Sequence, residues 1–108
     1  MAQTTSQLAE IIQRYTDQLR RMEIRVERVM LFGSYASGAP REGSDIDLVM
    51  VSSDWAKYSD IERLEILGIA AGLILEPIEA VGFTPEEIET HQLSSFWEMI
   101  LKEQAVAV

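Results

Sequence analysis

The sequence predicts one α/β (α+β) domain over residues 1–108, a small mixed sheet of three or more strands with helices packed against it. Three observations lead to this prediction. The apolar content of 47% is that of a folded protein. Three short apolar runs, each typical of a strand, alternate with segments whose apolar residues recur at helical spacing. Turns rich in Gly, Pro and Ser separate several of these segments.

The expected elements alternate along the chain, beginning with a helix. The predicted strands, which are rich in apolar residues, cover residues 26–32, 45–51 and 77–83. Amphipathic spacing and capping residues place the helices over residues 4–23, 34–37, from 59 or 60 to about 75, from 84 as far as 90–92, and from 94 or 95 to about 105. A loop over residues 38–44 joins the second helix to the second strand.

The helix that ends near residue 75 is expected to face the sheet with one apolar side. The residues on that side are Ile61, Leu64, Leu67 (or Gly68) and Ala71. Gly68 and Gly72 are expected to weaken this helix slightly and to let it approach the sheet closely.

A few other conspicuous side chains are interpreted conservatively. Phe96 is expected in the core, and Trp55 is left open between the core and a surface for a partner. His91, the only histidine, is expected to be exposed or to cap a helix. The acids after Pro85 are expected to form a solvated helix start, favoured by the helix dipole; they are Glu86, Glu87 and Glu89.

Charge and composition restrict the class of protein. The net charge of −9 makes direct binding of nucleic acid by the protein surface improbable, because that binding needs Lys and Arg against phosphates. It leaves room for a nucleotide bound through metal ions and is compatible with a basic partner. The absence of cysteine, of a signal segment and of a long apolar run predicts a cytoplasmic protein without a membrane span.

Two carboxylates at the start of the second strand are candidate metal ligands. Side chains alternate across a strand, so Asp45 and Asp47 point to the same face, about 6.5–7 Å apart. They repel each other unless a cation lies between them, and Mg²⁺ prefers a few carboxylates together with phosphate oxygens. Glu79 on a neighbouring strand adds a third carboxylate, and three such groups can hold two metal ions. The ordinary alternatives are a strand cap for the aspartates and a solvent-facing position for Glu79.

The Gly33-Ser34 turn complements these carboxylates. Glycine lets the backbone approach a phosphate closely, and the free N–H groups of the helix that follows favour anions. The Ser34 hydroxyl can donate a hydrogen bond to a phosphate oxygen. A glycine–serine turn is by itself common, so the prediction depends on its position between two apolar strands and beside the aspartates.

Gly33-Ser34, ten residues, and then Asp45-Ile46-Asp47 resembles the signature of the DNA polymerase β-like nucleotidyltransferase superfamily, in particular its minimal nucleotidyltransferases. The resemblance implies the nucleotidyltransferase fold, with Gly33, Ser34 and Ser44 binding the nucleotide. It further implies two Mg²⁺ ions held by Asp45, Asp47 and Glu79, the same three acids serving catalysis. Glu76 is the rival for the third carboxylate, but the spacing to Thr84-Pro85 favours Glu79. Relatives often carry Arg or Lys where Ser37 stands.

By the same resemblance, the chain is an enzyme that transfers AMP from ATP to a hydroxyl. The acceptor would be supplied by another protein or a second copy, and minimal nucleotidyltransferases are commonly paired as antitoxins with small helical HEPN toxins. The alternative is a binding module that neutralises such a partner by contact alone. A third hypothesis is transfer onto a small molecule. It would need an acceptor pocket, for which a chain of 108 residues leaves little room.

Overall fold

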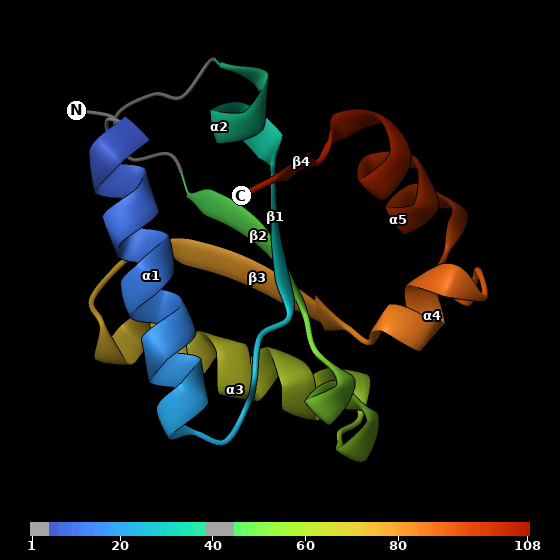
Figure 1. Ribbon diagram of the computed structural model, residues 1–108, viewed down its shortest axis with the longest axis horizontal. Coiled ribbons are helices and arrows are strands. Elements are labelled where there is room, and N and C mark those ends of the chain that lie inside the picture. Colours follow the sequence, from blue (N-terminus) through green and yellow to red (C-terminus); the bar gives the residue numbers. More distant parts are fainter. Residues whose placement is uncertain (1–4, 39–44) are drawn as a thin grey trace.

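The computed structural model describes residues 5–38 and 45–108 (Figure 1). Its strands are β1 (Arg28–Phe32), β2 (Ile46–Val51), β3 (Ile78–Phe83) and β4 (Val106–Ala107). Its α-helices are α1 (Thr5–Arg21), α2 (Gly33–Ser37), α3 (Asp60–Leu73), α4 (Pro85–Glu89) and α5 (Ser95–Met99). Two helical segments of other types complete it, the 3₁₀ helix η1 (Ser53–Lys57) and the π-helix η2 (Ile100–Gln104).

The sheet is mixed, as predicted, with strand order β3-β2-β1-β4. β1 is antiparallel to β2 and β4, whereas β2 and β3 are parallel and are joined through η1 and α3. The three predicted strands are confirmed, the first beginning at Arg28 rather than at residue 26. β4 was not predicted, and the last helix ends in a π turn at Gln104 before this strand.

Helices cover both faces of the sheet. On one face, α1 and α3 pack on Leu31, Leu48 and Met50, and together they form the larger core. On the other face, α4, α5 and η2 cover Met30, Val49 and Val51. Among the described residues, no helix has the length and apolar character needed to cross a bilayer.

The first helix, predicted to be amphipathic, packs on the core with one apolar side. Ile11, Ile12, Tyr15 and Leu19 are all buried. The Tyr15 hydroxyl donates a hydrogen bond of 2.8 Å to the carbonyl of Leu67 on α3, which joins the two helices that share a face of the sheet. Burial also raises the pKa of Tyr15 far above its usual range.

The third helix presents a different side to the sheet from the one predicted. Its buried residues are Arg63, Leu67, Ala70 and Ala71. Ile61 and Leu64 are exposed, so their prediction as sheet-facing residues was wrong. The predicted close approach at Gly68 and Gly72 was also wrong, because a Cβ added at either glycine would meet no atom within 4 Å.

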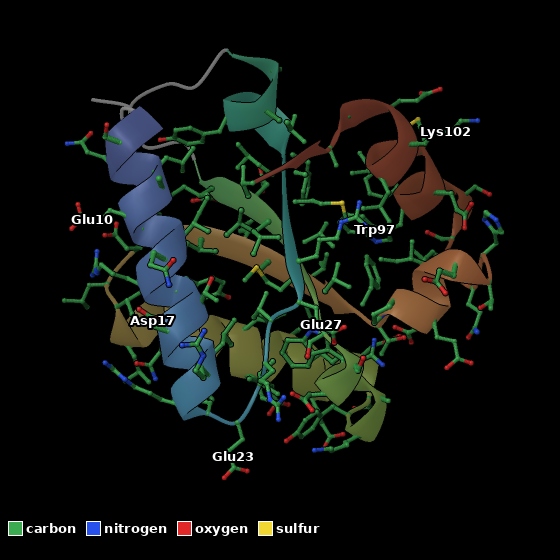
Figure 2. The ribbon with its side chains drawn as sticks, viewed as in Figure 1. Glu10, Asp17, Glu23, Glu27, Trp97 and Lys102 are labelled. Carbon is green, nitrogen blue, oxygen red and sulfur yellow. The ribbon has the colours of Figure 1, made fainter. Side chains whose placement is uncertain are left out.

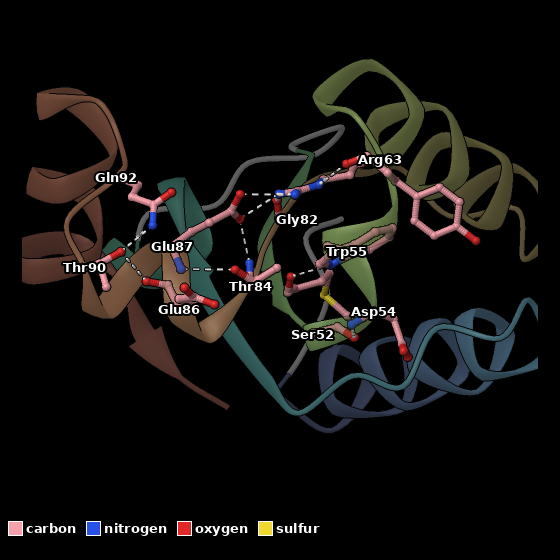
Figure 3. Close-up of polar contacts among 12 residues, drawn as sticks. Ser52, Asp54, Trp55, Arg63, Gly82, Thr84, Glu86, Glu87, Thr90 and Gln92 are labelled. Carbon is pink, nitrogen blue, oxygen red and sulfur yellow. Dashed lines mark hydrogen bonds and ion pairs between the residues drawn. The ribbon is translucent and has the colours of Figure 1, made fainter.

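The rotation of α3 is explained by Arg63, which lies inward and donates four hydrogen bonds (Figure 3). Its guanidinium donates to the Glu87 carboxylate at 2.7 and 3.1 Å, to the Gly82 carbonyl at 3.1 Å and to the Tyr58 carbonyl at 3.2 Å. A buried arginine is tolerated only with such partners. The network therefore ties α3 to the end of β3 and the start of α4.

Glu87 serves this network and the helix start together. Its carboxylate accepts a hydrogen bond from the Thr84 backbone, and its own N–H donates to the Thr84 hydroxyl, which completes a capping box. Burial acts to raise the pKa of Glu87, but the hydrogen bonds and charge of Arg63 and the bonds from Thr84 outweigh it, so the pKa is lowered. The expectation that Glu87 would be solvated was wrong, whereas Glu86 and Glu89 are exposed.

The aromatic residues occupy partly unexpected positions. Trp55 is fully buried, donates from Nε1 to the Met50 carbonyl at 3.0 Å, and lies so close to Gly82 that a Cβ there would come within 2.6 Å of its ring. Phe96 is exposed, so its predicted core position was wrong. Its neighbour Trp97 packs edge-on against Phe32 and Phe83 instead (Figure 2).

We expect Glu87→Gln to lower the free energy of unfolding at neutral pH by about 1–3 kcal/mol, because the Arg63 guanidinium would lose its charged partner. Because folding lowers the pKa of Glu87, this stabilisation is present above the unfolded pKa and is lost as pH falls through the folded pKa. The difference from the parent chain should therefore narrow below about pH 4 in urea titrations.

Glu89→Gln is the matched control, since Glu89 lies on the same short helix and is exposed. It should leave the unfolding midpoint nearly unchanged. Equal effects of the two substitutions would contradict the role assigned to Glu87.

Candidate active site

Three neighbouring strands bring the candidate residues onto one face of the sheet. Phe32 of β1 is paired with Asp47 of β2, and Asp47 is in turn paired with Glu79 of β3. Paired residues on adjacent strands point to the same face, and such strands lie about 4.8 Å apart. Asp45 stands two residues before Asp47, just outside β2, and is exposed. Three carboxylates therefore lie near one end of β2.

These carboxylates repel one another. The pKa of Asp47 is raised, first by partial burial and then by the negative charges of Glu79 and Asp45. Within the part of the chain that the structure describes, none of the three accepts a hydrogen bond or pairs with a cation. Among the described residues, nothing compensates the negative charge in this corner of the fold.

The donor set suits a hard divalent cation, but it is not already gathered around one point. Carboxylate oxygens are the ligands that Mg²⁺ prefers, and the mutual repulsion is what a bound cation would relieve. In residues 5–38 and 45–108, however, no three His, Cys, Asp or Glu side chains lie close enough together to hold an ion as they stand. The side chains of Asp45 and Glu79 are exposed, so a change of rotamer costs them little.

Gly33 makes room for the Asp47 carboxylate. Its backbone has φ +70°, a conformation that favours glycine, and a Cβ at this position would overlap Oδ2 of Asp47 and lie 2.9 Å from Cγ. The five-residue helix α2 starts here, and its N-cap residue, Phe32, provides no side-chain hydrogen bond to the first turn. Gly33 therefore lies beside Asp47, and Ser34 follows it in the first turn of α2. Ser44 lies outside the described residues.

The two candidates for the third carboxylate lie in different surroundings. Glu76 precedes β3 and accepts a hydrogen bond of 2.8 Å from Arg14 on α1, whose guanidinium also donates to the Ile74 carbonyl. Glu79 lies on β3 directly opposite Asp47. Of the two acids, only Glu79 faces Asp47 without a cation of its own.

A hollow of about 460 Å³ opens beside the carboxylates, and we call it the carboxylate hollow. Asp47 and Glu79 are its two acids, and the rest of its lining is apolar: Phe32, Leu64, Gly68, Ile78, Ala80, Val81, Phe96 and Trp97. The apolar wall was missed at the level of the sequence. The contribution of α3 and α5 to this wall depends on packing that no local pattern reveals.

A mixed sheet that presents paired aspartates beside a glycine–serine turn is the arrangement of a nucleotidyltransferase. The chain matches the family model described as "Nucleotidyltransferase domain" over residues 12–104, and it belongs to this family. The fold, the family and the class of enzyme expected from the sequence are thereby confirmed.

Individual relatives agree with this assignment. The chain is 33% identical, over 76 residues, to a protein of Methanocaldococcus jannaschii named as a putative protein adenylyltransferase; the match covers 66% of this chain and 87% of that protein. A chain from a toxin–antitoxin crystal structure with AMP-PNP superposes with a TM-score of 0.61 at 21% identity, covering 88% of this chain and 69% of that one. A chain from the structure of a tri-AMPylated Shewanella oneidensis HEPN toxin with an MNT antitoxin gives 0.52 at 18% identity, covering 90% and 70%.

Gly33→Ala should displace the Asp47 carboxylate as well as strain the backbone. Gly38→Ala is the matched control, because Gly38 also has a positive φ, +79°, but an added Cβ there meets nothing within 4 Å. Both variants should lose about 1–2 kcal/mol of stability from the left-handed conformation. We expect only Gly33→Ala to lose more than this, in urea titrations, and to weaken nucleotide binding. Equal behaviour of the two variants would contradict the contact with Asp47.

Asp47→Asn should raise the melting temperature at neutral pH by a few degrees when divalent cations are removed with EDTA. Because folding raises the pKa of Asp47, the folded chain holds this proton more tightly than the unfolded chain does. The corresponding stability is present below the unfolded pKa and is lost as pH rises through the folded pKa, and asparagine removes that loss.

Glu10→Gln removes one charge from an exposed position on α1 and controls for the change in net charge (Figure 2). It should leave the melting temperature nearly unchanged. A melting temperature of Asp47→Asn below that of the parent chain would contradict the repulsion described here.

Proposed function

We propose that this chain transfers AMP from ATP to a hydroxyl group of a protein acceptor and that it requires Mg²⁺. The observation that carries the proposal is the pairing of Asp47 with Glu79 on adjacent strands, beside Gly33, with no cation among the described residues to compensate them. The nucleotidyltransferase family supplies the class of reaction. The relative named as a protein adenylyltransferase favours AMP and a protein acceptor.

Each predicted site residue has a role in this proposal. Asp45, Asp47 and Glu79 would hold the metal ions, and Gly33, Ser34 and Ser44 would bind the nucleotide phosphates. Bound Mg²⁺ supplies neutralisation of the phosphate charge and a Lewis acid for displacement at phosphorus. The short helix that begins at Gly33 presents backbone N–H groups with no side-chain cap, which suits anionic oxygens.

The transfer itself is a displacement at the α-phosphorus of ATP. The acceptor oxygen forms a bond to this phosphorus, the bond from the phosphorus to the oxygen bridging to the β-phosphate breaks, and pyrophosphate leaves with the electron pair. The acceptor proton passes to a carboxylate of the site and then to solvent. Glu79 is our candidate for this role, because it is exposed in the apolar hollow where an acceptor can enter.

We further propose that the acceptor is a small helical toxin of the HEPN type and that the chain acts as its antitoxin. The support comes from structures with the same fold, one a toxin–antitoxin with AMP-PNP and another an AMPylated HEPN toxin with an MNT antitoxin. A second candidate function is neutralisation by contact alone. It is favoured by the finding that the carboxylates of the described residues are not gathered for a metal ion.

The test is transfer of label from α-³²P-ATP to a purified HEPN-type partner in the presence of Mg²⁺. We expect Asp47→Asn and Glu79→Gln to reduce the rate at least about 100-fold, since even outer partners of a metal site are worth roughly 10–100-fold. Glu76→Gln is the matched control and should retain most of the activity, because Glu76 is engaged by Arg14.

The two candidate functions give opposite results in this assay. Full neutralisation of the toxin by a chain without measurable transfer would favour the contact mechanism. Loss of transfer in Glu76→Gln but not in Glu79→Gln would contradict the assignment of the third carboxylate.

A further inference from the structure

The solvent side of α3 is unusually apolar for an exposed helix face. Besides the residues that α3 buries, it exposes Ile61, Leu64, Ile69 and Leu73, each with between 53% and 70% of its surface accessible. A monomeric protein rarely exposes a continuous apolar surface without using it. This surface is separate from the core-facing side formed by Leu67, Ala70 and Ala71.

The exposed face has the relief of a ridge beside a groove. Residues four apart form rows along a helix, and here Ile61, Glu65, Ile69 and Leu73 form a raised row. The next row is Leu64, Gly68 and Gly72, where the two glycines leave open space. We call this low row and its walls the α3 groove. Interlocking of such rows and grooves is the commonest way in which two helices pack.

The α3 groove is continuous with the candidate active site. Leu64 and Gly68 line the carboxylate hollow together with Asp47 and Glu79, and Phe96 of α5 lines it as well, with 57% of its surface exposed. β3 is an edge strand of the described sheet, so no further strand separates the groove from the carboxylates. A partner segment bound in the α3 groove would therefore lie close to Glu79.

The negative charge around the α3 groove indicates the charge of the partner that would bind there. Residues 58–101 contain nine of the eighteen acids but only one of the nine lysines and arginines, so they account for nearly all of the net charge of −9. That single arginine, Arg63, is buried in its ion pair with Glu87. Glu62 and Glu65 are both exposed on α3, and Glu65 lies within the raised row, between Ile61 and Ile69. A partner with lysines or arginines around an apolar stripe would complement this surface, whereas a second copy would bring like charges together.

We propose that the α3 groove docks a basic amphipathic helix of the acceptor protein and thereby delivers the acceptor hydroxyl to Glu79. This proposal rests on the proposed function for its chemistry, and it adds the surface and the kind of partner element that the transfer uses. The apolar residues of the partner helix pack against Leu64, Ile69 and Phe96, and its basic residues face Glu62 and Glu65.

The probe for the test is a fluorescein-labelled synthetic helix of about 20 residues, roughly 30 Å long, with leucine at helical spacing and lysine elsewhere. A second peptide has glutamate in place of each lysine. Binding to the full chain is followed by fluorescence anisotropy. We expect the lysine peptide to bind and the glutamate peptide not to bind.

Two substitutions test the groove itself. Gly68→Leu fills the groove and should not destabilise α3, because leucine is a better helix former than glycine and the site is open. Ile69→Glu adds a negative charge, which would strengthen a merely electrostatic attraction to the lysine peptide. We nevertheless expect both variants to weaken its binding at least about 10-fold. Val108→Glu, at an exposed apolar position away from α3, is the control and should bind at least as well as the parent chain.

The outcomes separate docking from catalysis. Calorimetry with ATP and Mg²⁺ should give the same affinity for the parent chain and Ile69→Glu, because Ile69 does not line the carboxylate hollow. Absence of ATP binding to the parent chain would count against the proposed function alone. No binding of the lysine peptide, or equal binding to all variants, would overturn the docking proposal. It would also be overturned if light scattering showed a dimer of the parent chain that either substitution dissociates, since a second copy would then occupy the groove.

Discussion

The repulsion between Asp47 on β2 and Glu79 on β3 is the constraint on which the candidate active site depends. The parallel register of β2 and β3 places Asp47 directly opposite Glu79, and Asp45 stands nearby. Partial burial first, and then the charges of Glu79 and Asp45, raise the pKa of Asp47 on folding. A protein retains such repulsion when a ligand relieves it. The conformation of Gly33, which admits the carboxylate of Asp47, belongs to the same arrangement.

The remainder of the fold maintains this register. A parallel pair of strands needs a crossover, and α3 is the main element of the one between β2 and β3. Ser59 and Glu62 cap its start. Arg63 connects it to Gly82 near the end of β3 and to Glu87 on α4 (Figure 3). Since α3 turns its arginine inward, it turns Ile61 and Leu64 outward. The buried ion pair and the exposed apolar face thus have one cause.

Local patterns predicted the three longer strands, the helix starts and the carboxylates that face the same side of the sheet. Strand alternation and helix capping depend only on neighbours in sequence. They failed where long-range pairing decides. Arg63 was not expected inside because its partner Glu87 lies 24 residues away. Phe96 is exposed, whereas its neighbour Trp97 packs on Phe32 and Phe83. The two-residue strand β4 is too short to show a period and exists only through its pairing with β1.

The measurement that tests the central claim most directly is the anomalous diffraction signal of Mn²⁺ in crystals grown with a non-hydrolysable ATP analogue. The account predicts manganese between Asp45, Asp47 and Glu79, with the phosphates against Gly33 and Ser34. Manganese bound at Glu76, or a nucleotide bound without any metal at these three carboxylates, would contradict it.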